Sequence, residues 1–378
     1  MIKVLHCVSV MDRAGQETFI MNVFRKIDKT EFMFKFLCTS KKKGDYDDEI
    51  YALGGEIFYL PENKYKHGLK NWINEIKILT KWLVENKDKY DIVHLHTCHA
   101  LSVLIYAEAC RRAEVKTLVV HCHSTSAPHK LLNYICREVC KFYTFEKNAC
   151  SYEAAKWLYG SKNINKAKIN LVYNGIDVPK YKYEQEISDK YRDILKINNK
   201  IVIGHVGRFV DVKNHELLVD IFFELKKSLP EVVLLLVGTG ELESQIKEKV
   251  KQLGIADSVI FLGSRCDVNN LMMVMDVLVF PSKYEGLSVV LVEAQAAGLR
   301  SIVSAHIVPK EEEIVPELFE KVEINREIVY WCEAIKKSLS KNYNRAEANR
   351  IVSESYFNIE NTVRMLQNEY RELKNNCV

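Results

Sequence analysis

Two carboxylates lie on either side of an apolar segment in the last third of the chain. Glu285 and Glu293 enclose the segment GLSVVLV, which is suited to burial. If a helix begins at Leu287 and Ser288, Glu285 lies in the loop before it and Glu293 about two turns along it. Eight helical residues rise about 12 Å, too far for two carboxylates that share acid/base chemistry. We interpret the pair as contacts to hydroxyls at opposite ends of one extended, phosphate-containing ligand. A capping Glu285 and an exposed Glu293 are the structural alternative.

Two cations follow an earlier strand-like run, IVIGHVG. Arg208 is predicted in the loop after that run, and Lys213 in the first turn of the next helix. Fixed cations beside the N–H groups of a helix start can bind phosphate oxygens together. Gly286 would let the backbone approach a ligand, and the N–H groups of Leu287 and Ser288 would add donors. Taken alone, Arg208 and Lys213 also fit a pair of solvated loop residues.

Alternating strand-like and helical runs must position these residues. IKVLHCVSV, DIVHLHT and TLVVHCHS alternate with amphipathic stretches such as LKNWINEIKILTKWLVENK, and the pattern restarts at IVIGHVG. This alternation indicates parallel sheets covered by helices, in which ligands bind beyond the carboxyl ends of the strands. We predict an α/β protein of two doubly wound domains, residues 1–178 and 179–354. A last helix at 355–378 is predicted to brace the first domain, although a plain solvated helix fits the pattern equally.

Composition supports this class of protein. A chain of 378 residues that is 48% hydrophobic suggests two domains of about 150–200 residues each. The net charge of +4 is too mild to indicate a nucleic-acid partner. The chain has no run of eighteen apolar residues and no signal-peptide pattern, which predicts a cytoplasmic location. The eleven cysteines are scattered singly, which favours reduced, buried thiols over disulfides or a metal site.

Three motifs suggest other chemistry and are set aside. GDYDDE, with Asp45, Asp47 and Asp48, resembles a metal-binding DxD, but it follows SKKK and opens a helix, so a solvated loop is favoured. HLHTCHA and HCHST suggest zinc, but successive side chains along a strand point to different faces, so His94 and His96 share a face and Cys98 is expected beyond the strand end. GTGELE lacks the third glycine of a dinucleotide fingerprint. The histidines and cysteines of the second motif are His94, His96, His99, His121, His123, Cys98 and Cys122.

Several longer segments resemble one enzyme family. MDRAGQET, NACSYEAAKWLYG, VYNGID, GRFVDVKNHELL, LLLVGTGELESQIKEKVKQLG and residues 259–299 are similar to the retaining glycosyltransferases of family 4, and closest to those of bacterial capsule and exopolysaccharide assembly. The resemblance covers nearly the whole chain and keeps the order and spacing of the motifs. It implies the GT-B fold, in which two Rossmann-like domains face each other across a cleft. VSAHIVPKEEEIVPELFEKVEI is the least typical part, with acidic and apolar residues alternating.

The resemblance assigns roles around the reacting bond. Gly15 would let the first loop approach the donor diphosphate or sugar, but Ala14 replaces the usual preceding glycine and makes that loop less free. His123 would point toward the anomeric carbon. Arg208 and Lys213 would hold the diphosphate and stabilise the negative charge that develops on the leaving nucleotide.

The resemblance also assigns residues that bind the rest of the donor. Glu285 would contact sugar hydroxyls, and Glu293 would bind the ribose. The loop Arg265–Cys266 would read the edge of the base. Backbone N–H groups for sugar and phosphate would come from Gly286, Leu287 and Ser288.

Together these roles imply metal-independent, retaining transfer of a hexose or N-acetylhexosamine from a nucleotide-sugar, with UDP the commonest base in the family. No cofactor is expected, and the acceptor would be a saccharide or a lipid-linked oligosaccharide. No protein nucleophile is evident, and the departing phosphate would take the acceptor's proton. A nucleotide-sugar epimerase and a non-catalytic nucleotide-sugar-binding protein on the same scaffold are the alternatives. Intact Arg208, Lys213, Glu285 and Glu293 argue against the binding protein.

One stretch bears on membrane contact. HKLLNYICREVCKFYTFEKN mixes basic and aromatic residues. Its apolar positions follow helical spacing and are predicted to face the core: Leu131, Leu132, Ile135, Val139 and Phe142. Because enzymes of this type act on lipid-linked acceptors at the inner leaflet, the hypothesis is a protein that binds that surface peripherally.

Overall fold

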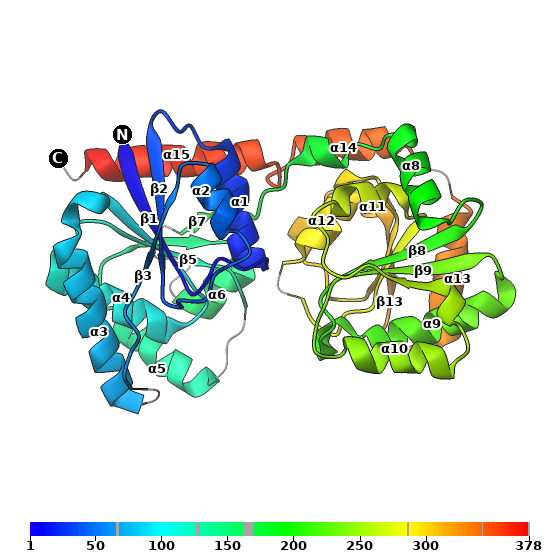
Figure 1. Ribbon diagram of the computed structural model, residues 1–378, viewed down its shortest axis with the longest axis horizontal. Coiled ribbons are helices and arrows are strands. Elements are labelled where there is room, and N and C mark those ends of the chain that lie inside the picture. The colour runs from blue at the N-terminus through cyan, green and yellow to red at the C-terminus, as the bar shows by residue number, and fades with distance from the viewer. Residues whose placement is uncertain (66–67, 126–128, 162–168, 286, 342, 377–378) are drawn as a thin grey trace. The chain divides into compact units, whose positions relative to one another are not determined.

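The protein consists of two compact units. The computed structural model describes residues 1–65, 68–125, 129–161, 169–285, 287–341 and 343–376. Unit 1 comprises Met1–Gly175 and Ile359–Val378, and unit 2 comprises Ile176–Asn358. Each unit is a parallel sheet with helices packed against it (Figure 1). Gly286, predicted as a backbone contact to the donor, lies outside the described residues.

Within the described part of unit 1, seven strands form a parallel sheet in the order β3-β2-β1-β4-β5-β6-β7. The strands are β1 (Ile2–Val8), β2 (Phe32–Cys38), β3 (Glu56–Tyr59), β4 (Ile92–His96), β5 (Leu118–Cys122), β6 (Glu146–Ala149) and β7 (Asn170–Leu171). The helices are α1 (Gly15–Lys26), α2 (Asp47–Ala52), α3 (Gly68–Glu85), α4 (Ala100–Ala113), α5 (Lys130–Cys140), α6 (Tyr152–Tyr159) and α15 (Ile359–Asn375). The central strands β4 and β5 are buried at every residue, because helices cover both faces of the sheet.

The last helix belongs to unit 1. Helix α15, drawn in red in Figure 1, packs its buried side chains into the same core as α1 and β1. Tyr370 is fully buried, and its hydroxyl shares a hydrogen bond of 2.7 Å with His94 Nδ1 of β4. The end of the chain is thereby fixed to the centre of the first sheet.

In the described part of unit 2, six strands form a parallel sheet in the order β10-β9-β8-β11-β12-β13. The strands are β8 (Ile201–Val206), β9 (Val232–Val237), β10 (Val259–Phe261), β11 (Val277–Phe280), β12 (Ser301–Ser304) and β13 (Phe319–Val322). The helices are α8 (Gln185–Leu195), α9 (His215–Ser228), α10 (Glu243–Gln252), α11 (Val268–Val274), α12 (Val289–Ala296), α13 (Ile328–Leu339) and α14 (Arg345–Ser353). The strand order reverses between β8 and β11, and the loops at such a switch point are where doubly wound sheets bind ligands.

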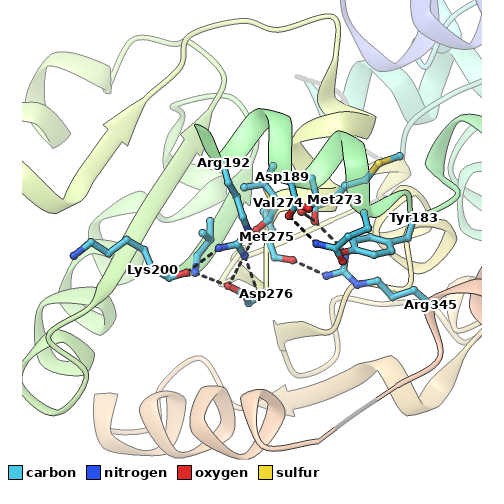
Figure 2. Close-up of polar contacts among 12 residues, drawn as sticks. Tyr183, Asp189, Arg192, Lys200, Met273, Val274, Met275, Asp276 and Arg345 are labelled. Atoms are coloured by element: carbon cyan, nitrogen blue, oxygen red, sulfur yellow. Dashed lines mark hydrogen bonds and ion pairs between the residues drawn. The ribbon is translucent and has the colours of Figure 1, made fainter. Parts of the chain in front are cut away.

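The amino edge of the second sheet is held by arginines (Figure 2). Arg192 of α8 donates to the carbonyl of Val274 and pairs with Asp276 at 3.1 Å. Arg345 of α14 donates to the carbonyl of Met275 at 2.6 Å. A cavity of about 460 Å³ lies beside them, and its lining includes Lys200, Asp276 and Arg300, the residues directly before β8, β11 and β12. Because ligands of this fold class bind at the carboxyl edge, we regard the arginines as a structural clamp of the opposite edge.

Helix α5 contradicts one expectation. Its buried residues are Asn133, Cys136 and Cys140, and the Asn133 side chain accepts a 2.7 Å hydrogen bond from the N–H of Ala100, the first residue of α4. The buried side of α5 is thus the one that carries Asn133, and the opposite side faces outward. Most of the apolar residues that were expected in the core are therefore exposed: Leu131, Ile135, Val139 and Phe142. Leu132 is half-buried against the core.

Two further expectations can be compared with the described residues. The cysteines there are free and mostly buried, as predicted. The prediction of a solvated GDYDDE loop is wrong for Asp47, which is 2% exposed and accepts hydrogen bonds from Gly44 N at 3.0 Å and Tyr59 Oη at 2.7 Å. Among the helices described, none is both long enough and apolar enough to cross a membrane.

Candidate functional site

The carboxyl edge of the second sheet joins two charges that are distant in sequence. Lys213 lies in a short 3-10 helix (Asp211–Lys213) after β8, and Glu285 lies in the loop after β11. Lys213 Nζ is 2.7 Å from Glu285 Oε1, and the side chains are 17% and 9% exposed. The ammonium also lies 4.7 Å from the ring centroid of Phe280, the last residue of β11. Because β8 and β11 are neighbours in the sheet, two residues predicted to touch one ligand form a nearly buried ion pair.

Arg208 presents a different kind of cation. It follows β8, is exposed, and has no ion pair with any of the residues that the structure describes. Its loop is packed tightly, since a Cβ at Gly238 would lie 2.1 Å from the carbonyl oxygen of Gly207. Gly238 also has a φ of +137°, which favours glycine. Arg208 is thus an exposed cation on a constrained loop, five positions before the paired Lys213 in the sequence.

Helix α12 begins later than expected, and this changes the donor-binding prediction. Ser288 is its N-cap residue, and the helix starts at Val289. From there to Glu293 the helix rises only about 6 Å, so the prediction of two full turns between the carboxylates is wrong. The N–H of Ser288 donates to Glu312 Oε2 at 3.1 Å and is not free for a ligand. Leu287 lies half-buried in the loop before the helix.

Glu293 is half-buried, so the alternative of an exposed side chain is wrong. The hydroxyl of Tyr181 donates to Glu293 Oε1 at 2.5 Å. Burial raises the pKa of Glu293 to about 7, and the hydrogen bond from Tyr181 opposes that shift. At neutral pH the group is therefore divided between its acid and carboxylate forms. Its predicted contact with a ribose stays a prediction.

Glu312 is a residue at this edge that the sequence reasoning missed. It ends a 3-10 turn (Lys310–Glu312) after β12 and is 1% exposed. Burial, with smaller contributions from the charges of Glu285 and Glu311, raises its pKa to about 8, although the hydrogen bond from the Ser288 N–H opposes that shift. The only signal in the sequence was the unusual alternation of acidic and apolar residues around it.

The loop predicted to read the base lies after β10. The guanidinium of Arg265 donates two hydrogen bonds to the carboxylate of Asp267, from Nε to Oδ1 at 2.8 Å and from Nη2 to Oδ2 at 2.6 Å. Cys266 is exposed. The guanidinium of Arg265 is therefore already engaged within its own loop, and the base-reading role of the loop stays a prediction.

Gly15 and His123 lie at the carboxyl edge of the first sheet. Gly15 is the first residue of α1, and the N-cap Ala14 provides no side-chain hydrogen bond. A Cβ at Gly15 would meet no atom within 4 Å, so no neighbouring atom of the described protein demands a glycine there. His123 follows β5, and its Nε2 shares a 2.9 Å hydrogen bond with His96 Nδ1. Burial lowers the pKa of His123 to about 3, so its imidazole is neutral at pH 7.

His123 belongs to a layer of histidines on one face of the first sheet. His96 Nε2 shares a second hydrogen bond of 2.9 Å, with His6 Nδ1 of β1. Phe19 of α1 lies against the rings of His96, His121 and His123. We call this set the histidine layer, and its members are His6, His94, His96, His121 and His123. Burial lowers the pKa of every member.

The histidine layer has the spacing of a metal site, which the strand-alternation argument did not anticipate. Ring nitrogens of His6, His94 and His96, and those of His96, His121 and His123, lie within 4.8 Å of one another. However, the rings of His121 and His123 are stacked at 4.1 Å, and those of His96 and His123 at 5.1 Å. In-plane lone pairs of stacked rings run side by side, so the rings would have to turn to bind one ion. Cys122 packs in the hydrophobic core on the opposite face of the first sheet.

Comparison with known proteins identifies the family. Residues 13–180 match the model for Glycosyltransferase Family 4, and residues 187–349 match the model for Glycosyl transferases group 1. The putative glycosyltransferase EpsF of Bacillus subtilis (strain 168) is 34% identical over 343 residues, which cover 89% of this chain and 87% of EpsF. The chain belongs to glycosyltransferase family 4.

Other relatives of this glycosyltransferase carry more specific names. The UDP-Gal:alpha-D-GlcNAc-diphosphoundecaprenol alpha-1,3-galactosyltransferase of Escherichia coli is 27% identical, covering 80% of this chain and 79% of the relative. The capsular polysaccharide biosynthesis glycosyltransferase CapH of Staphylococcus aureus is also 27% identical, over 90% of this chain and 92% of CapH. Anabaena HepE, solved in complex with UDP and glucose, superposes with a TM-score of 0.77 at 18% identity, and the match covers 98% of this chain and 100% of HepE. This likeness confirms the predicted GT-B fold.

Proposed function

We propose that this glycosyltransferase transfers a hexose or N-acetylhexosamine from a UDP-sugar to a saccharide acceptor, with retention of anomeric configuration, in capsular or exopolysaccharide synthesis. The observation that carries the proposal is the nearly buried pair of Lys213 and Glu285 at the switch point of the second sheet. A cation and a carboxylate fixed side by side suit a ligand that offers phosphate oxygens and sugar hydroxyls together. The names of EpsF, CapH and the Escherichia coli enzyme support the polysaccharide context.

The proposed chemistry requires charge stabilisation rather than a protein base. Breaking the bond between the anomeric carbon and the diphosphate builds negative charge on the leaving group, and Lys213 and Arg208 would stabilise it. The ion pair with Glu285 already fixes the ammonium of Lys213, so little reorganisation accompanies the reaction. The acceptor hydroxyl would attack from the face that the phosphate leaves and give its proton to that phosphate.

UDP is proposed as the nucleotide, and the reaction as independent of metal. The Escherichia coli relative is named for a UDP-galactose donor, and HepE was solved with UDP and with UDP-glucose. The two cations would supply the positive charge that a metal ion supplies in other transferases. The roles of His123 and Gly15 beside the donor belong to this proposal.

A lipid-linked acceptor and peripheral contact with an anionic membrane are proposed from helix α5. Leu131 and Ile135 of α5 are 74% and 52% exposed, and Phe142, two residues after the helix ends, is 89% exposed. A cavity of about 270 Å³ beneath this helix has mainly apolar walls and basic residues at Arg137, Lys141 and Lys147. Exposed apolar side chains with cations beside them suit the interface of an anionic bilayer.

The donor proposal is tested first by thermal stability with UDP, GDP and ADP, and then with a panel of UDP-sugars, all in EDTA. Ligand at a hundred times its dissociation constant stabilises a fold by about 2.7 kcal/mol. The donor that shifts the melting temperature is then supplied with a polyprenyl-diphosphate-linked N-acetylglucosamine, and the product linkage is determined by NMR. An α product from an α donor supports retention. A changed sugar without transfer would show an epimerase, and the absence of any nucleotide effect would refute the donor site.

Membrane contact is tested by sedimentation with vesicles of phosphatidylglycerol and phosphatidylcholine. The paired variant Leu131→Ser/Phe142→Ser is expected to lose binding. Tyr51→Ser/Val329→Ser is the matched control, because it removes two other exposed apolar side chains. Equal binding by both double variants, or no binding by the wild type, would contradict the role of α5.

A further inference from the structure

Glu312 joins three segments at the carboxyl edge of the second sheet. Its Oε2 accepts the N–H of Ser288, the N-cap of α12, at 3.1 Å. Its own main-chain carbonyl accepts a 2.8 Å hydrogen bond from Gln295 Nε2, inside α12. Gln295 Oε1 in turn accepts the N–H of Val315 at 2.8 Å. The loop after β12 and the start of α12 are thus tied together through buried polar atoms.

These ties bear on the loop that carries Glu285. Ser288 follows Glu285 by three positions in the sequence, so a fixed Ser288 N–H limits how far the Glu285 carboxylate can move from the start of α12. The other end of the loop is restrained by the pair of Glu285 with Lys213. Among the described residues, Glu312 provides the side-chain acceptor for the N–H of this N-cap, and the side chain of Ser288 makes no capping hydrogen bond to the first turn of α12.

We propose that Glu312 is a positioning residue of the donor site, which holds Ser288, the N-cap of α12, in the place that the sugar and diphosphate require. This inference rests on the proposed function. The residue touches no reacting atom and acts through the loop. Nothing in the family comparison or in the motif spacing assigned it a role.

The unpaired second oxygen of Glu312 argues against a role in stability alone. Glu312 Oε1 is buried and has no hydrogen-bond partner within the described structure, and the same holds for the hydroxyls of Ser282, Ser288 and Ser304. Ser304 is the last residue of β12, Ser282 and Glu312 lie in the loops after β11 and β12, and Ser288 is the N-cap of α12. Buried polar atoms without partners are costly, and a protein tolerates several at one place where a ligand site requires them. A nucleotide-sugar, with its many hydroxyls, is a ligand of matching chemistry.

The ionisation of Glu312 provides a readout that a purely structural residue would not give. The charged groups that act on it are Glu285, from the loop after β11, and Glu311, its neighbour in the chain. Lys213 is held by Glu285. With a pKa of about 8, Glu312 is mainly protonated at neutral pH and becomes a second negative charge beside Glu285 as the pH rises past that value. That charge would repel a diphosphate, so KM for the donor is expected to rise in alkaline buffer.

The test compares Glu312→Gln and Glu312→Ala with the matched control Glu311→Gln. Glu311 is the exposed neighbour of Glu312, and the control replaces the same type of side chain. KM and kcat are measured with whichever of UDP-glucose, UDP-galactose and UDP-N-acetylglucosamine the wild type uses. Glu312→Ala is expected to raise KM about tenfold, the effect of one lost buried hydrogen bond. Glu312→Gln keeps an acceptor for Ser288 and should restore KM, but without the alkaline rise seen in the wild type. Glu311→Gln should keep the wild-type KM at neutral pH and the alkaline rise, which begins at a slightly lower pH because the Glu311 charge helps to raise the pKa of Glu312.

Amide hydrogen exchange of the peptide spanning residues 283–290, measured without ligand, separates this inference from the proposed function. Faster exchange in Glu312→Ala than in Glu311→Gln is expected even if no nucleotide-sugar is bound. Unchanged exchange, or wild-type KM and kcat in Glu312→Ala with only a lower melting temperature, would overturn the positioning role. A wild type that neither binds UDP nor transfers sugar would instead refute the proposed function.

Discussion

The histidine layer is expected to make unit 1 sensitive to acid. His6 is 2% exposed, and burial lowers its pKa from 6.5 to about 3. At pH 5 the unfolded chain therefore binds a proton at His6 that the folded chain does not bind. The stability associated with neutral His6 is fully present above its unfolded pKa and is lost as the pH falls below it. Each unit of pKa difference corresponds to 1.36 kcal/mol, so His6 alone costs about 2 kcal/mol of unfolding free energy at pH 5.

The other members of the layer act in the same direction. His123 has the same lowered pKa of about 3, so its neutral form in the folded protein lowers the unfolding free energy at pH 5 by a further amount of about 2 kcal/mol. Burial and the mutual repulsion of charged rings lower the pKa of His94, His96 and His121 as well. Because a typical domain is stable by about 5–15 kcal/mol, the sum is a large part of the total.

The assay is urea unfolding near pH 7.5 and near pH 5, on the wild type, His6→Gln and His306→Gln. His306 is the matched control because its side chain is 86% exposed. His6→Gln is expected to lose about 2 kcal/mol less than the wild type on acidification, and His306→Gln the same as the wild type. Glu293 and Glu312, whose pKa values are raised, oppose the trend equally in all three proteins. An equal loss in the wild type and His6→Gln, or no loss in the wild type, would refute the reasoning.

Three further changes have defined expected results. Lys213→Ala should lower kcat/KM for the donor by about 10²–10³-fold, because one preorganised charge is lost; unchanged kinetics would contradict the site. Gly238→Ala should lower the unfolding free energy by about 1–3 kcal/mol, since its Cβ would lie 2.1 Å from a carbonyl oxygen. Gly254→Ala, where φ is also positive but no atom lies within 4 Å, should cost less in the same denaturation measurement. Asn133→Ala should cost about 1 kcal/mol in urea unfolding, because its carbonyl oxygen caps α4.

Much of the fold was determined by the sequence alone. The alternation of strand-like and helical runs predicted two doubly wound units, because the period of apolar residues fixes the type of each element and the need to bury it. The family resemblance then gave the GT-B fold and the glycosyltransferase activity class. These features depend on local pattern and on the order of motifs along the chain, both of which are readable in one dimension.

The contacts at the site were decided by tertiary structure. The pairing of Lys213 with Glu285 depends on β8 and β11 being neighbours, and no local pattern specifies which strands adjoin. The capture of the Ser288 N–H by Glu312 likewise needs the loop after β12 to fold back onto α12.

Helix α5 and the histidine layer also depend on contacts between distant parts of the chain. The spacing in α5 correctly predicted a helix, but the side that faces inward carries Asn133, Cys136 and Cys140, and Asn133 is bonded to the distant Ala100. Alternation correctly placed His94 and His96 on one face, but only the strand order brought His6 and His123 to the same face. The period of apolar residues determines which side of a segment can be buried. The element that packs against that side depends on contacts between residues distant in the sequence.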